Sequence, residues 1–149
     1  MDASTSLTDS SHAASSMGGL TRIAPYVLSL LRIMAALLFM EHGLSKFFGF
    51  PWATAPHPTP FDLEWFSAAI ELVGGVLLTL GLFTRLAALI MSGEMAVGYF
   101  LIHAPKSFYP YLNGGELAIM YCFVFFYLVF AGAGPLSFDA LIFAKGRRP

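Results

Sequence analysis

Long apolar segments, separated by short polar or Pro-rich breaks, fill the sequence after its first 22 residues. Four of them are long enough to cross a bilayer as helices, because the hydrocarbon core requires about 20 mostly apolar residues. They cover residues 24–44, 63–83, 86–103 and 115–133. The pattern therefore predicts an all-α fold, a four-helix transmembrane bundle over residues 23–140.

The breaks predict how the helices are connected and oriented. The connection around Thr84 is so short that the second and third segments must form an antiparallel hairpin. Prolines between residues 51 and 60, and Asn113-Gly114 further on, break the other two connections. Lys and Arg concentrate at Arg22, at Arg85 and in the C-terminal tail, so the positive-inside rule predicts that both termini are cytoplasmic.

The two ends of the chain differ from the apolar middle. Residues 1–22 are Ser-rich and carry few large apolar side chains, which predicts a disordered tail because too little surface could be buried. Residues 141–149 contain one Lys and two Arg, which predicts a basic cytoplasmic tail.

Composition supports a membrane protein. The chain is 57% hydrophobic and only 11% charged, whereas soluble domains carry about 25% charged residues. The lipid bilayer is therefore the expected partner. A net charge of −1 argues against a nucleic-acid partner, and one cysteine, Cys122, allows no internal disulfide.

Ionisable side chains gather in the outer half of the predicted bundle, the half farther from the cytoplasm, or near the membrane midplane. A charged group at the bilayer centre costs about 2.5–3.5 kcal/mol on insertion scales, so it usually has a partner and often a function. The candidate catalytic residues are therefore Glu41, His42, Glu71, Glu94, His103 and Glu116. Candidates for contacts with a substrate are Lys46, Lys106 and Asn113.

Helical phase relates some of these positions to one another. His42 and Lys46 are one turn apart and share a face. Glu94 and His103 are nine residues apart and point to opposite sides of a regular helix. They can face one pocket only if the helix is interrupted before His103.

Glu71 has a different setting. It shares a helix face with Gly74 and Gly75. Glycines on one face allow two membrane helices to approach closely. We therefore expect the Glu71 carboxyl group to point into a close helix contact.

Three interpretations of the ionisable residues remain open. In the first, they stabilise the bundle, with Glu41 or Glu116 paired to Lys46 or Lys106 and with Arg32 reaching inward. In the second, they form a proton-handling pocket for a quinone or another small substrate, because a buried carboxyl group and a histidine could relay protons together. The third is a metal site. No Glu-x-x-His pair occurs, so we predict no metal site.

The chain resembles the DoxX family of small bacterial membrane proteins over about residues 24–140. The resemblance rests on a combination of motifs: His-Gly-x-x-Lys-Phe-Phe-Gly from His42, Glu-x-x-Gly-Gly from Glu71, Gly-Leu-x-Thr-Arg from Gly81, and Asn-Gly-Gly-Glu from Asn113. It implies four spans and a multi-pass location in the bacterial cytoplasmic (inner) membrane. The family name refers to a quinone-reducing thiosulfate oxidoreductase, so the resemblance also implies an oxidoreductase-like role.

Together these observations predict a component of a membrane redox process with a polar pocket. They leave the cofactor open, with a quinone as one candidate. Two alternatives stay open: a non-catalytic subunit or scaffold that recruits a redox partner, and a small transporter that is active as an oligomer. The residues do not decide whether the protein is an enzyme. The expected protein partners are a second copy of the chain or a redox protein.

Overall fold

The computed structural model describes residues 3–52 and 57–145. Within these residues every regular element is a helix and there is no strand, which confirms the all-α prediction. The elements, in chain order, are α1 (Ala3–Phe48), α2 (Leu63–Leu80), α3 (Thr84–Gly98), the π-helix η1 (Tyr99–His103), α4 (Pro110–Asn113), α5 (Glu116–Ala131) and α6 (Phe138–Lys145).

Three helical stretches in the described part are long and apolar enough to cross a membrane. They are Gly19–Phe48, Leu63–Leu80 and Thr84–His103, the last of which combines α3 and η1. The fourth predicted span coincides with α5, which is apolar but has 16 residues. Many large apolar side chains are exposed on all of these helices, as expected for a surface covered by lipid. The count of four spans and the cytoplasmic location of both termini stay predictions.

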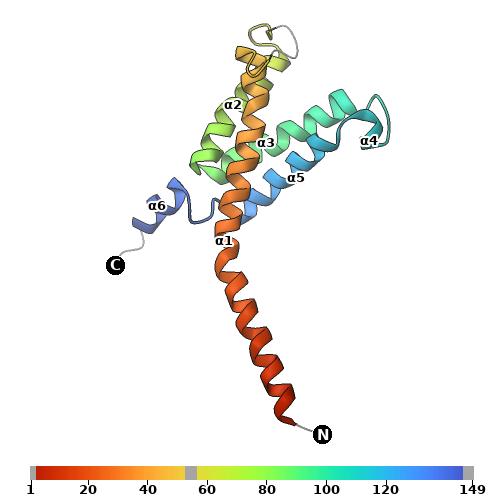
Figure 1. Cartoon of the computed structure of the whole chain (residues 1–149). Coiled ribbons are helices and arrows are strands. Elements are labelled where there is room, and N and C mark those ends of the chain that lie inside the picture. Colours follow the sequence, from red (N-terminus) through yellow and green to blue (C-terminus); the bar gives the residue numbers. More distant parts are fainter. Residues whose placement is uncertain (1–2, 53–56, 146–149) are drawn as a thin grey trace.

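The helices form two arms that diverge from a common base (Figure 1). One arm consists of α1 packed against α2, and the other of α3 packed against α5. The arms are joined by the turn after α2, where Gly81 ends the helix with a left-handed φ of 67°. This early stop places the end of α2 at Leu80, three residues before the end of the predicted segment at Phe83.

Small residues permit the close packing of α1 on α2. A Cβ atom added at Gly43 would lie 2.9 Å from the Ala68 carbonyl oxygen, and one added at Gly75 would lie 2.7 Å from Met40 Cβ. Both separations are too short for real side chains. The prediction that Glu71 shares the buried face of α2 with Gly75 is confirmed, since both residues are buried.

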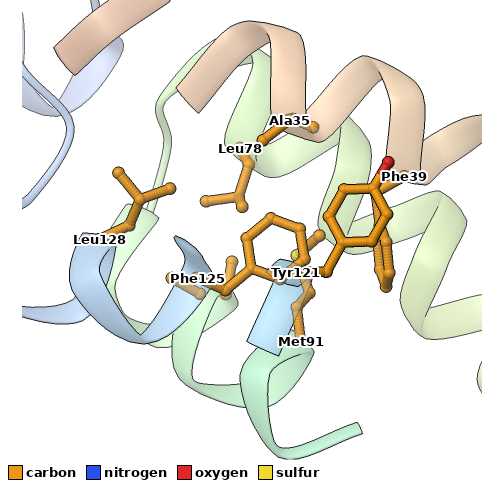
Figure 2. Packing of buried hydrophobic residues seen from close by; sticks show 10 residues of the cluster. Ala35, Phe39, Leu78, Met91, Tyr121, Phe125 and Leu128 are labelled. Carbon is orange, nitrogen blue, oxygen red and sulfur yellow. The ribbon is translucent and has the colours of Figure 1, made fainter. Parts of the chain in front are cut away.

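The apolar core lies where the two arms meet (Figure 2). Phe39 of α1 contacts Phe125 of α5 edge-on at 4.9 Å between ring centroids, and Tyr121 stacks on Phe125 at 5.6 Å. Leu78 of α2 and Met91 of α3 complete the contact and are fully buried. This core joins the two arms at their base.

A polar contact attaches the segment after α5 to the base. Arg32 of α1 is fully buried. Its guanidinium donates to the carbonyl oxygens of Ala133 at 2.8 Å and Leu136 at 2.7 Å. The expectation that Arg32 reaches inward is therefore confirmed, and its partners are backbone groups in the described part of the chain.

Asp139 makes the second half of this attachment. Its carboxylate accepts hydrogen bonds at 2.9 Å from the backbone N–H groups of Phe83 and Thr84, at the start of α3. It thereby satisfies two of the amide groups that a helix N-terminus leaves without partners. We call the contacts of Arg32 and Asp139 the C-terminal clasp.

The predicted tails are described only in part. α1 begins at Ala3, but the side chains of residues 3–18 lie outside the described part, and the disordered tail over residues 1–22 stays a prediction. α6 covers Phe138–Lys145, and residues 146–149 of the predicted basic tail lie outside the described residues.

Candidate functional site

A cavity of about 740 Å³ is lined by residues of both arms. All four long helices contribute to its wall, together with η1. Most lining residues are apolar, which is typical of ligand cavities with few polar groups to orient the ligand. The ionisable and hydroxyl-bearing residues of the wall are His42, Lys46, Glu64, Ser67, Glu71, Glu94, His103 and Tyr121.

Four of these residues form a continuous polar chain across three helices. Lys46 of α1 forms an ion pair with Glu71 of α2, with 2.7 Å between Nζ and Oε1. The same ammonium donates to Ser67 Oγ at 2.8 Å. The Ser67 hydroxyl in turn donates to Glu94 Oε1 of α3 at 2.8 Å. We call Lys46, Ser67, Glu71 and Glu94 the carboxyl cluster.

Helix packing and helical phase produce this cluster. Gly43 brings α1 against α2, and Lys46 follows it by about one turn, so its ammonium reaches over the neighbouring helix. Ser67 and Glu71 are four residues apart and therefore share one face of α2. Glu94 comes from α3, in the other arm, and the hydrogen bond from Ser67 to Glu94 therefore links the two arms.

Two oxygens of the cluster have no partner. Glu71 Oε2 and Glu94 Oε2 are buried and accept no hydrogen bond from any described residue. Glu71 as a whole is only 3% exposed. A buried polar atom without a partner costs about 1–3 kcal/mol, and the cluster contains two carboxyl groups for one ammonium. Because both oxygens are buried, a ligand in the cavity would meet the cluster through its more accessible member, Lys46, whose side chain is 23% exposed.

The π-helix η1 explains how Glu94 and His103 line the same cavity. The Ala104 N–H donates to the Tyr99 carbonyl oxygen at 2.9 Å, a bond to the fifth residue back. A π turn contains more residues than an α turn, so it rotates the residues after it relative to those before it. This turn is the interruption before His103 that a shared pocket required.

The His103 ring is held by its surroundings. Its Nδ1 lies 3.0 Å from the Asn113 carbonyl oxygen, and the ring stacks on Tyr99 with 6.3 Å between centroids. Asn113 is buried, donates to the Ser107 carbonyl oxygen at 2.8 Å and accepts from the Gly115 N–H at 2.8 Å. Asn113 thus supports His103, and its side-chain amide is engaged in the fold.

The remaining candidates lie elsewhere. Glu41, Lys106 and Glu116 are exposed and do not line the cavity. The expectation that Lys46 pairs with Glu41 or Glu116 is wrong, because Glu71 approaches Lys46 across the close α1–α2 contact. The described residues contain no group of three or more His, Cys, Asp or Glu side chains placed to bind a metal ion.

Sequence reasoning missed Ser67 and Tyr121. Ser67 lies one turn before Glu71, and that spacing could have indicated a hydroxyl on the same face. Tyr121 lies in an uninterrupted apolar helix and packs edge-on to His42, with 6.3 Å between ring centroids. Nothing in the local sequence of α5 distinguishes Tyr121 from its aromatic neighbours.

Comparisons with known proteins identify relatives of the chain. The DoxX family model matches residues 27–104. A Haemophilus influenzae protein named "Uncharacterized protein" is 44% identical over 134 residues, covering 87% of this chain and all of the relative. A Bacillus subtilis protein named "Putative oxidoreductase CatD" is 30% identical over 122 residues, covering 80% of this chain and 88% of the relative. No solved structure matches the chain significantly.

Proposed function

This chain belongs to the DoxX family of membrane proteins, and from that premise we propose that it is a quinone-binding component of a membrane redox process. The cavity between the arms is the proposed binding site, and the carboxyl cluster its polar end. The name of the Bacillus subtilis relative, which describes an oxidoreductase, supports the same class of function.

One observation carries the proposal. An ammonium and two carboxyl groups, those of Lys46, Glu71 and Glu94, line a mostly apolar cavity of about 740 Å³. A quinone combines a flat ring, oxygens that exchange protons and an apolar tail. The ring and tail suit the apolar wall, and the oxygens suit the cluster.

In the proposed chemistry, the carboxyl cluster handles the protons and a partner protein handles the electrons. Interconversion of quinone and quinol moves two electrons and two protons. The carboxyl cluster would exchange protons with the ring oxygens through Glu94 and Ser67, which lie on one hydrogen-bonded path. The two electrons would be exchanged with a redox protein partner. Lys46 balances the charge of Glu71 and keeps that carboxylate in place.

We further propose that the protein is a multi-pass protein of the bacterial cytoplasmic membrane, with four spans and both termini in the cytoplasm. In that orientation the cavity lies in the outer half of the membrane. The placement of Lys and Arg along the sequence supports this arrangement.

Binding measurements in mild detergent test the function. The purified protein is titrated with a short-tailed 1,4-benzoquinone, and the dissociation constant is measured by isothermal calorimetry. We expect saturable binding, and we expect Glu71→Gln to weaken it at least tenfold because the variant no longer carries a carboxylate for Lys46.

Glu116→Gln is the matched control, since Glu116 is exposed and does not line the cavity. It should bind like the unaltered protein. Absence of saturable binding to the unaltered protein, or equal weakening by both variants, would refute a quinone site in this cavity.

A further inference from the structure

His103 gives the cavity a second polar contact point, separate from the carboxyl cluster. We propose that the Asn113 carbonyl holds His103 as the Nδ1–H tautomer, and that His103 Nε2 accepts a hydroxyl hydrogen from the ligand. The reduced, dihydroxy form of the ligand would therefore bind in preference to the oxidised form. This inference rests on the proposed function and names the redox state that the site selects.

The tautomer follows from the hydrogen bond. His103 Nδ1 lies 3.0 Å from the Asn113 carbonyl oxygen. A carbonyl oxygen can only accept, so Nδ1 must carry the hydrogen. In a neutral imidazole the other nitrogen is then an acceptor. Within the described part of the chain, Nε2 has no hydrogen-bond partner, and the ring lines the cavity.

The surroundings of the ring prevent it from turning over easily. Tyr99 stacks on the ring, with an angle of 20° between the two planes. Gly115 leaves room for this arrangement, because a Cβ atom there would lie 2.6 Å from the Tyr99 ring. Asn113, whose carbonyl accepts from Nδ1, is itself anchored by hydrogen bonds to Ser107 and Gly115. The acceptor at Nε2 is thus built into the fold.

The two contact points lie along one helical stretch. Glu94 lies in α3 and His103 at the end of η1, and both residues line the cavity. One ligand hydroxyl would meet the carboxyl cluster and the other would meet His103 Nε2.

The character of the unpartnered atoms determines which redox state binds better. At the cluster end the cavity offers both a donor, the Lys46 ammonium, and carboxyl groups, so that end serves either form; at the other end His103 Nε2 is an acceptor only. A quinol offers two O–H donors, whereas a quinone offers only carbonyl acceptors. Two acceptors facing each other gain no hydrogen bond and lose their solvation. The site therefore favours the quinol.

The first arm of the test is independent of any ligand. The full chain is labelled with ¹⁵N-histidine and studied by NMR in detergent at neutral pH, with His103 assigned from its absence in His103→Asn. We expect a protonated Nδ1 and an unprotonated Nε2. A protonated Nε2, with or without a protonated Nδ1, would overturn the inference.

The second arm compares the two redox forms of one short-tailed 1,4-benzoquinone, with the reduced form handled anaerobically. We expect the quinol to bind at least tenfold more tightly than the quinone. His103→Asn retains a donor toward the Asn113 carbonyl but has no Nε2, and should reduce this preference below threefold. Glu116→Gln is the control, because Glu116 is exposed and outside the cavity, and should leave it unchanged.

The outcomes separate the two proposals. Equal or tighter binding of the quinone would overturn the inference and leave the quinone site intact. If neither form binds to the folded protein, the proposed function is wrong. The proposal that His103 Nε2 accepts a hydrogen bond from a quinol hydroxyl is then wrong as well. If His103→Asn keeps the full preference, His103 has only a structural role.

Discussion

The carboxyl cluster and the C-terminal clasp are both polar groups buried in an apolar chain, but they use their polar atoms differently. In the clasp, the Arg32 guanidinium and the Asp139 carboxylate are directed at backbone groups of the same chain. In the cluster, Glu71 and Glu94 each keep one oxygen without a partner beside a cavity. Arg32 Nε is likewise buried without a partner, so neither burial nor a missing partner alone distinguishes the two sites; the cluster differs in lining the larger cavity.

The packing around the two sites differs in the same sense. A Cβ atom at Gly81 would collide with the Arg32 guanidinium, and one at Gly134 would collide with the Ser29 hydroxyl. Arg32 is thus enclosed by close contacts, whereas the Asp139 end of the clasp borders a smaller cavity of about 410 Å³. The cluster borders about 740 Å³ of open volume. We expect the clasp to determine stability and the cluster to determine ligand binding, and the following variants test that division.

Arg32→Ala should have the largest effect on stability. It removes two charge-assisted hydrogen bonds and leaves a cavity in a fully buried place, for an expected loss of about 3–5 kcal/mol. Thermal unfolding in detergent measures it. Arg85→Ala is the control, because Arg85 is exposed and donates to the Val129 carbonyl oxygen, and it should cost less than about 1 kcal/mol. Equal losses would contradict a special role for Arg32.

Gly81→Ala should come next. The residue has a φ of 67°, and a side chain there would displace Arg32, so we expect a loss of about 2 kcal/mol. Gly114→Ala is matched in backbone conformation, with a φ of 70° but open space around its Cβ position. It should cost about 1 kcal/mol. Unfolding of both variants by the same method isolates the contribution of the contact with Arg32.

Asp139→Ala should cost about 1 kcal/mol, the usual value for loss of a capping side chain. The N–H groups of Phe83 and Thr84 would lose their acceptor. Asp139→Asn keeps one acceptor oxygen and should lose about half as much. Hydrogen exchange at Phe83 and Thr84 reports the effect directly. Unchanged exchange in Asp139→Ala would show that the clasp does not hold this end of α3.

Glu94→Gln should have the smallest effect on stability, within about 0.5 kcal/mol, because the amide keeps an acceptor for Ser67 and no longer buries an acidic group. Its effect on ligand should be large, with quinol binding at least tenfold weaker in a titration. A destabilisation as large as that of Arg32→Ala would abolish the distinction between the two sites and make the carboxyl cluster a structural element.

Much of the fold could be predicted because it depends on local properties. Apolar length and turn residues predict the helices, and helical phase predicts that Glu71 lies on the buried face with Gly74 and Gly75. The inward direction of Arg32 is expected in one of the three interpretations, because long charged side chains turn their charged ends away from apolar surroundings. These properties act within one helix or between its neighbours, so the sequence alone indicates them.

The candidate site could be predicted only in part, because its details depend on contacts between distant segments. The pairing of Lys46 with Glu71 requires the distance between two helices, and the bridge through Ser67 requires the position of a third. The capping of α3 by Asp139 joins residues more than 50 positions apart. No local pattern encodes such distances.

The π turn before His103 has a consequence for comparing this chain with its relatives. One additional residue in a helical turn rotates every later side chain about the helix axis relative to the residues before it. A relative with one residue fewer between its counterparts of Glu94 and His103 would direct that imidazole toward the acyl chains. Spacing between these two positions, more than overall identity, should therefore sort family members that share this pocket from those that do not.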